Sequence, residues 1–529
     1  MLHKTGFFLK FISSVLAVVM LLGLFACDSS GKPEPEDTAN VSESDDQPVP
    51  ETDPLDGLNY KGEVFTIHTS TNVIGSLTNS FKSSNYLIQG EEEMQADKAA
   101  NSAYKRNKLV EEKLNIKLNY IESNYEYNEV TTNVRELIKS GADDIGLIIN
   151  DIRTIVLATE GLLHDARYGS YFDFSKPYWY DDLMASACLN DNTRFALMGD
   201  YFIDILRYTN CLLFNKDLYT RFGCDGESVY DIVRDGDWTF DTMMAMLQGG
   251  EGYPYTSTYI DATGNRKRDR RDTYGLVMHD WWGPMIPFMT AADPGYISRN
   301  EEGYPEITTY NERTISLHDK MMKMLYLDET GIGKVFNFDN DDTILAFVED
   351  RALILGGEMV GSLESSVYAD SEVNFAILPY PKLDDMQKDY ISPIHDTAEI
   401  GFIPATLSIE NLQVASAVIE ALSRETVNTV IPDYYESTLK IRYARESANA
   451  EMLELIHDHY NSAFVVAWTV SVNNYFLEGI YSSVYQNSNT FTSYCRMYES
   501  AAQEKLRELI FNQELVIEQM ENQYGKLTN

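Results

Sequence analysis

The segment Gly141-Ala-Asp-Asp-Ile-Gly-Leu-Ile-Ile-Asn-Asp151 decides the fold class of this chain. Its residues 144–150 form a short apolar run that predicts a strand, and residues 152–163 after it have the spacing of a helix. Before it, residues 128–140 are helical, and residues 116–121 alternate apolar and polar side chains as a strand does. This alternation predicts a parallel sheet covered by helices.

The same alternation continues in both directions along the chain. Further strands are expected over residues 64–69, 194–202, 209–214, 274–278, 352–355, 374–378 and 399–404. Further helices are expected over residues 92–114, 239–247 and 409–422, with residues 451–515 mostly helical. About 470 residues take part, which is too many for one core and predicts an α/β protein of two lobes.

The N-terminus has the form of a secretory signal peptide. Lys4 and Lys10 accompany an apolar run over residues 11–25, which at about 15 residues is short for a bilayer that needs about 20. The run ends in Leu24-Phe-Ala-Cys27, which resembles a bacterial lipobox. That resemblance implies removal of residues 1–26 and lipidation of Cys27. The alternatives are an ordinary signal peptide with a coincidental cysteine, or a single spanning helix.

An acidic segment follows Cys27. Residues 28–56 carry ten acidic side chains, five prolines and a single base, Lys32. Such a segment has little to bury and repels itself, so residues 27–58 are expected to form a disordered acidic tether.

Charge and cysteine content narrow the function further. The formal net charge is −40, and most of it lies beyond the tether, so nucleic acid is not an expected partner. Four cysteines besides Cys27 are too few for a disulfide framework in so long a chain, and their redox state stays open: Cys188, Cys211, Cys224 and Cys495. Cys211 lies in an apolar run and is expected to be a buried thiol.

Six segments, in order and spacing, resemble a known family. They are residues 97–116, residues 141–151, Leu213-Phe-Asn-Lys-Asp-Leu218, Asp237-Trp-Thr-Phe-Asp241, Ala352-Leu-Ile-Leu-Gly-Gly-Glu358 and Asn374-Phe-Ala-Ile-Leu-Pro379. The family is that of the extracellular solute-binding proteins of ABC importers (family 1, the sugar-binding type typified by maltose-binding protein). The resemblance covers most of residues 60–425.

The resemblance implies a two-lobed, periplasmic-binding-protein-like (type II) fold with a ligand cleft between the lobes. Residues 59–198 and 397–428 would form the first lobe, and residues 199–396 and 429–529 the second. The chain would cross between them near residues 196–202, 393–400 and 428–434. Cleft closure over the ligand is what the family's shape implies.

The function that this implies is delivery of a carbohydrate, most simply an oligosaccharide, to an ABC permease. The protein would be a lipid-anchored monomer at the outer face of the cytoplasmic membrane, without a catalytic residue or cofactor. Peptides and polyols stay open as ligands, and the type of cell envelope is undetermined. Two rivals remain: a surface-anchored glycan hydrolase, which needs two carboxyl groups about 5–10 Å apart, and a ligand sensor on the same fold.

Aromatic side chains in loops are the first candidates for ligand contact. Trp281 and Trp282 follow an expected strand end, and Trp179 and Tyr180 lie in an aromatic turn. The alternative for Trp281 and Trp282 is that one or both pack beneath their loop. Two other tryptophans are expected to be structural: Trp238 at a helix start and Trp468 in the core.

Polar candidates lie at strand ends and crossings. Asn150 and Asp151 end the strand that opened this section, where the family places an acid on ligand hydroxyls; the alternative is a helix N-cap. Glu358 follows two glycines at a strand end, where the backbone can approach a ligand. Asp200 and Asp396 lie in or beside expected crossings.

One loop has the spacing of a calcium site. Residues 261–272 place oxygen-bearing side chains at positions one, three, five, nine and twelve, as an EF-hand loop does. They are Asp261, Thr263, Asn265, Asp269 and Asp272. The loop lacks the glycine at position six and carries five basic residues, so it is expected to be a degraded calcium loop held by Arg–Asp pairs, without a metal.

Overall fold

A computed structural model describes residues 53–71, 85–92, 97–126, 128–221, 228–247, 273–278, 282–326, 340–435, 447–460 and 463–527. The chain from Asp53 to Asn529 clusters as one compact unit. Several predictions lie outside the described residues: those on Cys27, Cys224, Trp281, the tether up to residue 52 and the loop 261–272. The side chain of Trp282 also lies outside them.

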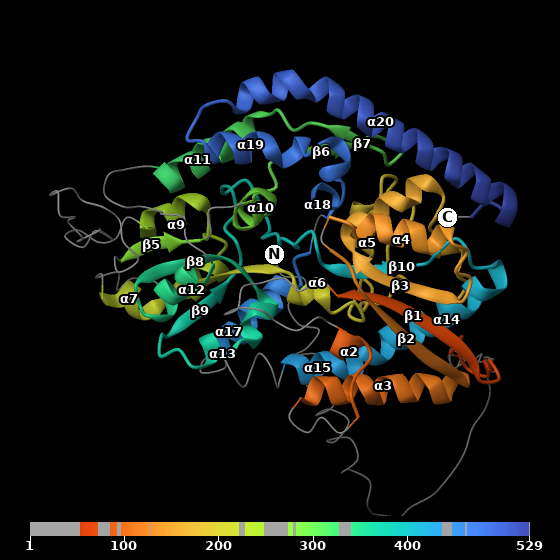
Figure 1. Cartoon of the computed structure of the whole chain (residues 1–529). Coiled ribbons are helices and arrows are strands. Elements are labelled where there is room, and N and C mark those ends of the chain that lie inside the picture. The colour runs from red at the N-terminus through yellow and green to blue at the C-terminus, as the bar shows by residue number, and fades with distance from the viewer. Residues whose placement is uncertain are drawn as a thin grey trace, which may run out of the picture. The chain divides into compact units, whose positions relative to one another are not determined.

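The first lobe is built on a four-stranded sheet in the order β10-β3-β1-β2 (Figure 1). β1 (Glu63–Thr71) pairs in parallel with β2 (Ile116–Asn124) and with β3 (Ile145–Asp151), while β10 (Glu399–Phe402) runs antiparallel to β3. Every residue of β3 is buried, as its apolar sequence predicts. The parallel strand–helix–strand arrangement expected around residues 141–151 is therefore confirmed.

Helices cover this sheet. α3 (Lys98–Leu114) begins at Asp97, whose side chain accepts a hydrogen bond from Ala100 N, so it starts later than the expected residue 92. η1 (Ile152–Glu160) is a 3₁₀ helix where an α-helix was expected. The remaining helices of this lobe and its edge are α2 (Asn85–Ile88), α4 (Val130–Lys139), η2 (Ala166–Tyr168), α5 (Asp181–Ala187), α14 (Ile409–Asn428) and α15 (Val430–Tyr434).

The second lobe has its own four-stranded sheet, in the order β5-β8-β4-β9. Its strands are β4 (Asn210–Asn215), β5 (Tyr274–Val277), β8 (Ala352–Met359) and β9 (Phe375–Leu378). Among these described strands, β5 and β8 pair in parallel, whereas β4 runs antiparallel to both β8 and β9. The lobe also holds α7 (Lys216–Arg221), α8 (Val229–Arg234), α9 (Phe240–Leu247), α10 (Trp282–Ala291), α11 (Glu312–Tyr326), α12 (Asn340–Val348), η3 (Val360–Glu364), α13 (Ser366–Ala369) and the hairpin β6 (Ile297–Arg299) with β7 (Pro305–Ile307).

The first crossing between the lobes is not the continuous strand expected over residues 194–202. It makes isolated bridges, Trp179 with Gly199 and Leu197 with Gly401, and then forms α6 (Asp204–Arg207). A Cβ atom on Gly401 would lie 2.3 Å from Phe202 Cζ, so only glycine lets β10 lie this close to the crossing. The sheet thus borders the crossing without incorporating it.

The C-terminal helices correct the predicted lobe boundaries. They are α17 (Ser447–His457), α18 (Phe464–Trp468), η5 (Val470–Val472), α19 (Tyr475–Tyr485) and α20 (Phe491–Tyr524). α17 packs on β9, but α15 packs on α3, α18 on η1 and α5, and α20 on η1 as well as α11. Residues 429–529 therefore belong to both lobes, and Figure 1 shows α20 extending across them.

The folded unit also begins earlier than expected. Asp53 pairs with Lys113 at 2.6 Å and with Arg424 at 2.9 Å, and Leu55 is buried. These contacts make residues 53–58 part of the body, so the predicted end of the tether at residue 58 is wrong.

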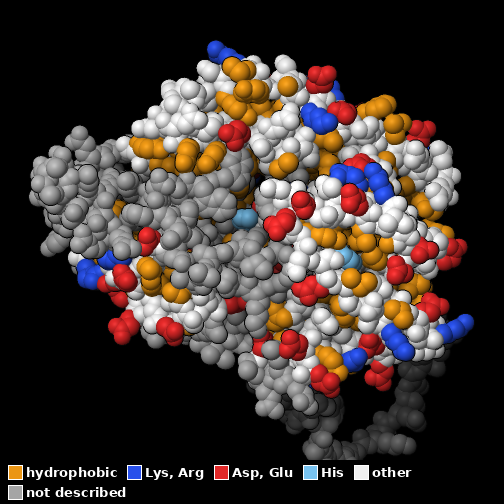
Figure 2. Space-filling model, viewed as in Figure 1, with side chains coloured by type: hydrophobic (Ala, Val, Ile, Leu, Met, Phe, Trp, Pro, Cys, Tyr) orange, Lys and Arg blue, Asp and Glu red, His pale blue; other side chains and the backbone are white. Residues whose placement is uncertain are grey.

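The core and surface agree with the composition. Trp238 and Trp468 are fully buried, and Cys188, Cys211 and Cys495 are buried free thiols, as expected of Cys211. Figure 2 shows acidic side chains scattered over the described part of one face, with basic ones less frequent. No helix among the described residues is both long and apolar enough to cross a membrane.

Candidate functional site

Five side chains from distant parts of the chain meet where the two lobes join. We call them the junction cluster: Tyr180, Asp200, Tyr435, His457 and Tyr460. Tyr180 and Asp200 come from the first lobe and the first crossing, and Tyr435 follows α15. His457 ends α17, which is fixed to the second sheet because Asn449 of that helix accepts a hydrogen bond from Ile377 N at 2.9 Å.

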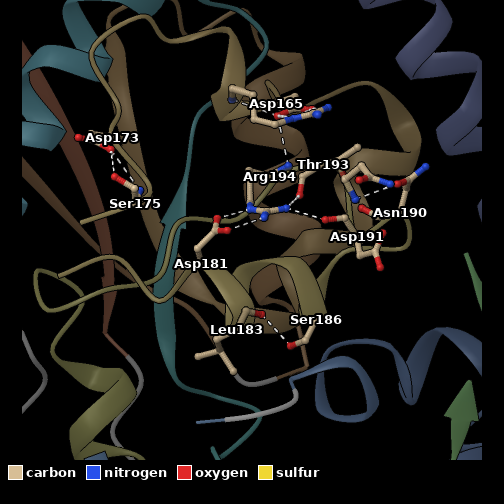
Figure 3. Close-up of polar contacts among 12 residues, drawn as sticks. Asp165, Asp173, Ser175, Asp181, Leu183, Ser186, Asn190, Asp191, Thr193 and Arg194 are labelled. Carbon is tan, nitrogen blue, oxygen red and sulfur yellow. Dashed lines mark hydrogen bonds and ion pairs between the residues drawn. The ribbon is translucent and has the colours of Figure 1, made fainter. Parts of the chain in front are cut away.

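A polar network around Arg194, shown in Figure 3, holds the residues that follow Tyr180. Arg194 donates to both carboxylate oxygens of Asp181, the next residue along the chain, at 2.6 and 2.9 Å. Arg194 Nη1 also donates to the carbonyls of Asp191 and Thr193, so its guanidinium is fully engaged within this loop. Tyr180 N donates to Met198 O at 3.1 Å, which ties the same turn to the first crossing. Tyr180 is therefore held on a rigid support.

Hydrogen bonds connect the cluster across the lobes. Tyr180 Oη donates to Asp200 Oδ1 at 2.6 Å and lies 2.9 Å from His457 Nε2. Burial disfavours the charged form of His457, but hydrogen bonds and charge from Asp200 and Asp458 outweigh it and raise the pKa of His457 to about 9. The imidazolium at neutral pH therefore donates through Nε2 to Tyr180 and through Nδ1 to Asp458, at 3.1 Å.

Three tyrosine rings surround this polar core. The ring of Tyr180 lies 5.3 Å from that of Tyr460 and 5.7 Å from that of His457, and Tyr435 lies 6.4 Å from His457. Burial raises the pKa of Tyr180, Tyr435 and Tyr460 above its usual range, and all three residues are half-buried. Aromatic rings gathered around a few polar groups are typical of sites that bind small molecules.

A second polar group lies at the end of β3. Asp151 is fully buried, caps η1 through Arg153 N, and is paired with the Arg153 guanidinium at 2.7 Å. Burial raises the pKa of Asp151 in spite of that pairing, and the charge of Asp396 raises it further. Asp396 in turn lies 3.0 Å from His395 Nδ1. The two carboxyl groups are thus electrostatically coupled at the edge where β10 enters the first sheet.

Several predicted ligand residues prove to have structural partners. Asn150 donates to Ser70 Oγ at 2.9 Å and accepts from Thr154 Oγ1 at 2.8 Å, so its amide is used inside the lobe. Asp151 has the N-cap role that was the alternative to ligand contact. Both are fully buried, which favours the structural interpretation of this strand end.

The structure does not support ligand contact by Trp179. Its indole Nε1 donates to Glu420 at 2.8 Å, and its ring packs edge-on against Phe172 and Phe174 in the first lobe. Trp179 is therefore buried within the first lobe. Glu358 is buried at the end of β8, beside Cys211 of β4, and Gly357 before it packs against Pro284.

A buried ion pair lies beside the junction cluster. Arg207 of α6 donates to Glu364 of η3 through Nε at 2.8 Å and to Asp204 at 3.0 Å. Tyr434 Oη, at the end of α15, donates to the same Glu364 at 2.8 Å. This group connects the first crossing to η3 of the second lobe and to α15 of the first.

Only two of the five residues of the junction cluster were predicted from the sequence. Tyr180 and Asp200 were candidates, whereas Tyr435, His457 and Tyr460 were not, because no local pattern links them to residues more than two hundred positions earlier. No group of histidine, cysteine and acidic side chains among the described residues has the arrangement of a metal site.

Comparisons with known proteins give solved structures only, since no protein-family model and no curated protein matches the chain. The maltose/maltodextrin-binding domain MalE from Bdellovibrio bacteriovorus, bound to maltotriose, is 13% identical, with a TM-score of 0.49 over 84% of this chain and 100% of its own. The GacH receptor of Streptomyces glaucescens GLA.O, solved unliganded and with acarbose, is 12% identical, with a TM-score of 0.49 over 84% and 99%.

A third match is the ABC substrate-binding protein Lmo0181 from Listeria monocytogenes in complex with cycloalternan. It is 12% identical, with a TM-score of 0.48 over 87% of this chain and 99% of its own. Identities this low transfer no ligand, so what the site binds follows from the residues of this chain alone.

Proposed function

We propose that this chain is an extracellular solute-binding protein that delivers a carbohydrate, an oligosaccharide in the simplest case, to an ABC import permease. The observation that carries the proposal is the junction cluster. It places aromatic rings, a carboxylate and an imidazolium where two α/β lobes meet.

The chemistry of the cluster suits a hydroxylated ligand. Tyrosine rings offer apolar faces to the C–H surface of a sugar, and their hydroxyl groups can donate or accept. Asp200 is an acceptor for ligand hydroxyls, and His457 as imidazolium is a donor. Apolar surfaces combined with a few fixed polar groups are the usual lining of a small-molecule site.

The position of the junction cluster suggests how ligand binding would change the conformation that the permease recognises. Tyr180 belongs to the first lobe and His457 to a helix fixed on the second. A ligand that contacts both lobes favours the conformation in which they are close, by as much as its affinity differs between the two states. A permease that recognises the closed form would then receive loaded protein only.

The same proposal includes a lipid on Cys27 that holds the protein at the outer face of the cytoplasmic membrane. Its support is the sequence Leu24-Phe-Ala-Cys27 with the acidic segment after it. A tether of this kind raises the local concentration of the protein at its permease, which is the advantage of linking two partners to one surface. The binding unit itself is proposed to be a monomer.

The proposal assigns no reaction to the protein. The rival hydrolase needs one carboxyl group free to donate a proton and a second across the substrate. Asp151 has a raised pKa and lies near Asp396, but its carboxylate is taken up by Arg153 at 2.7 Å and by the η1 cap. Analysis of an incubated oligosaccharide tests this: recovery of the intact sugar supports a binding protein, and release of shorter products contradicts it.

Ligand-dependent thermal stability tests the binding itself. The full chain is screened against mono- and oligosaccharides, with polyols and short peptides in parallel, because a ligand at a hundredfold excess over its Kd stabilises the native state by about 2.7 kcal/mol. Tyr460→Ala is expected to abolish the shift, whereas Tyr498→Ala, an exposed tyrosine on α20, is expected to keep it. No shift with any sugar, or shifts with peptides only, would contradict the proposal.

A further inference from the structure

We infer that the β6–β7 hairpin and α20 form a latch that fastens the two lobes to each other independently of the three crossing segments, and so limits how far the lobes can separate. This inference concerns the scaffold and does not rest on the proposed ligand.

Arg299 at the end of β6 is the first fastening. The hairpin belongs to the second lobe by sequence, yet Arg299 Nη1 donates to Leu189 O at 2.9 Å, and Nη2 donates to Cys188 O at 2.7 Å and Ser186 O at 3.0 Å. These carbonyls lie at and just beyond the C-terminus of α5 in the first lobe. A cation bound to the free carbonyls at a helix C-terminus is favoured both by hydrogen bonding and by the helix dipole.

The hairpin turn adds a close backbone contact. Asp191 N donates to Gly303 O at 3.3 Å. Gly303 has a φ of +83°, and a Cβ atom there would lie 2.0 Å from Asp191 Oδ1. The positive φ therefore favours glycine here, and a larger residue would also have to displace the Asp191 side chain.

The C-terminal half of α20 is the second fastening to the first lobe. Tyr524 packs against Tyr168 and His164 with ring centroids 5.5 and 5.9 Å apart, and Tyr168 Oη donates to Gly525 O at 3.1 Å. Earlier in the same half of the helix, Gln513 is buried and its Oε1 accepts a hydrogen bond from Asn190 N at 3.2 Å.

The N-terminal half of α20 is held by the second lobe. Phe491 stacks on His318 of α11 with ring centroids 5.6 Å apart. α11 is tied to that lobe by Lys320, which pairs with Asp241 of α9 at 2.6 Å, and by Arg313, which pairs with Asp384 at 3.1 Å.

The helix between these ends is continuous. α20 has 34 residues without glycine or proline, and such a helix is about 50 Å long. Figure 1 shows it crossing from one lobe to the other. Because an unbroken helix resists bending, the lobes cannot move far apart unless the contacts at one end of α20 and those of Arg299 break.

Distances between the lobes test the latch. Nitroxide labels are attached through non-canonical residues at two exposed positions, Lys139 on α4 and Met386 in the second lobe, and distances are measured by pulsed electron resonance on the full chain in detergent. The variants are Arg299→Gln and Tyr524→Ala, which weaken the two fastenings separately. The control is Arg234→Gln, which breaks exposed ion pairs on α8 and α17.

The parent and the control are expected to give one narrow distance distribution, and each latch variant to add a population at longer distance. If Arg299→Gln fails to fold, Tyr524→Ala at the end of α20 still tests the second fastening. A distribution that is the same in the parent and in the folded latch variants would overturn the inference.

Discussion

Tyr180 and His457, 277 residues apart in the sequence, lie 2.9 Å apart through Oη and Nε2 and join the first lobe to a helix of the second. Because Tyr180 also donates to Asp200, a continuous chain of hydrogen bonds runs from the first crossing to α17. The charge of His457 and the geometry of the junction are thus coupled.

The stability of the protein should depend on the ionisation of His457. Its pKa is raised from 6.5 to about 9, so its contribution is complete below pH 6.5 and is lost as the pH rises through 9. In urea unfolding, the stability advantage of the parent over His457→Gln should fall by about 2–3 kcal/mol across that range. An advantage that does not change with pH would contradict the assignment of a charged His457.

Removal of the Arg207 side chain should be severely destabilising. Arg207→Met leaves Glu364 and Asp204 without their buried cation, which costs about 3–5 kcal/mol in comparable cases. Arg234→Met, which breaks exposed pairs, should cost at most about 1 kcal/mol. Urea midpoints measure both, and adding Glu364→Gln to Arg207→Met should recover part of the loss. Equal costs at the two sites would show that the junction does not depend on this ion pair.

Gly401 should tolerate no side chain. A Cβ atom there would lie 2.3 Å from Phe202 Cζ, so Gly401→Ala should cost about 1–3 kcal/mol by overpacking. Gly356 is the matched control, because its Cβ would meet neighbours only at 3.6 Å. Thermal unfolding compares the two alanine variants, and an equal effect at both positions would contradict the close approach of β10 to the first crossing.

Membrane attachment should require Cys27. The variant Cys27→Ser is expected to leave the membrane fraction, and mass spectrometry of the parent is expected to find a lipid on the N-terminal cysteine of the mature chain. Cys224→Ser serves as the control and should stay in the membrane fraction. A Cys27→Ser protein that remains membrane-bound would argue for a spanning helix instead.

Most of the helices and strands, and the division into two lobes, could be predicted from the sequence. Strands such as β3 begin with an apolar run and lie next to helices with clear periodicity, so their pattern is local. The C-terminal helices were also expected, but their assignment to one lobe was wrong. An amphipathic sequence shows that a helix packs against other elements, but it does not show which elements these are. Contacts of Tyr524 with Tyr168 or of Arg299 with α5 have no local signature.

The site was harder to predict for the same reason. Trp179 looked like a ligand residue because a tryptophan in a loop is conspicuous, and only the fold brings Glu420 to its indole. His457 was not a candidate, because its partners Tyr180 and Asp200 are distant in sequence. Ion pairs and ring contacts between residues far apart in the chain have no fixed spacing in the sequence, so sequence patterns do not predict them.

Calorimetric titration of the full chain with the best saccharide from the screen tests the central claim most directly. The expected result is saturable binding at one site, weakened at least tenfold, or by about 1.4 kcal/mol, in Tyr460→Ala and unchanged in Tyr498→Ala. Failure of every saccharide to bind, or equal affinity in the parent and in a folded Tyr460→Ala protein, would contradict a carbohydrate site at the junction cluster.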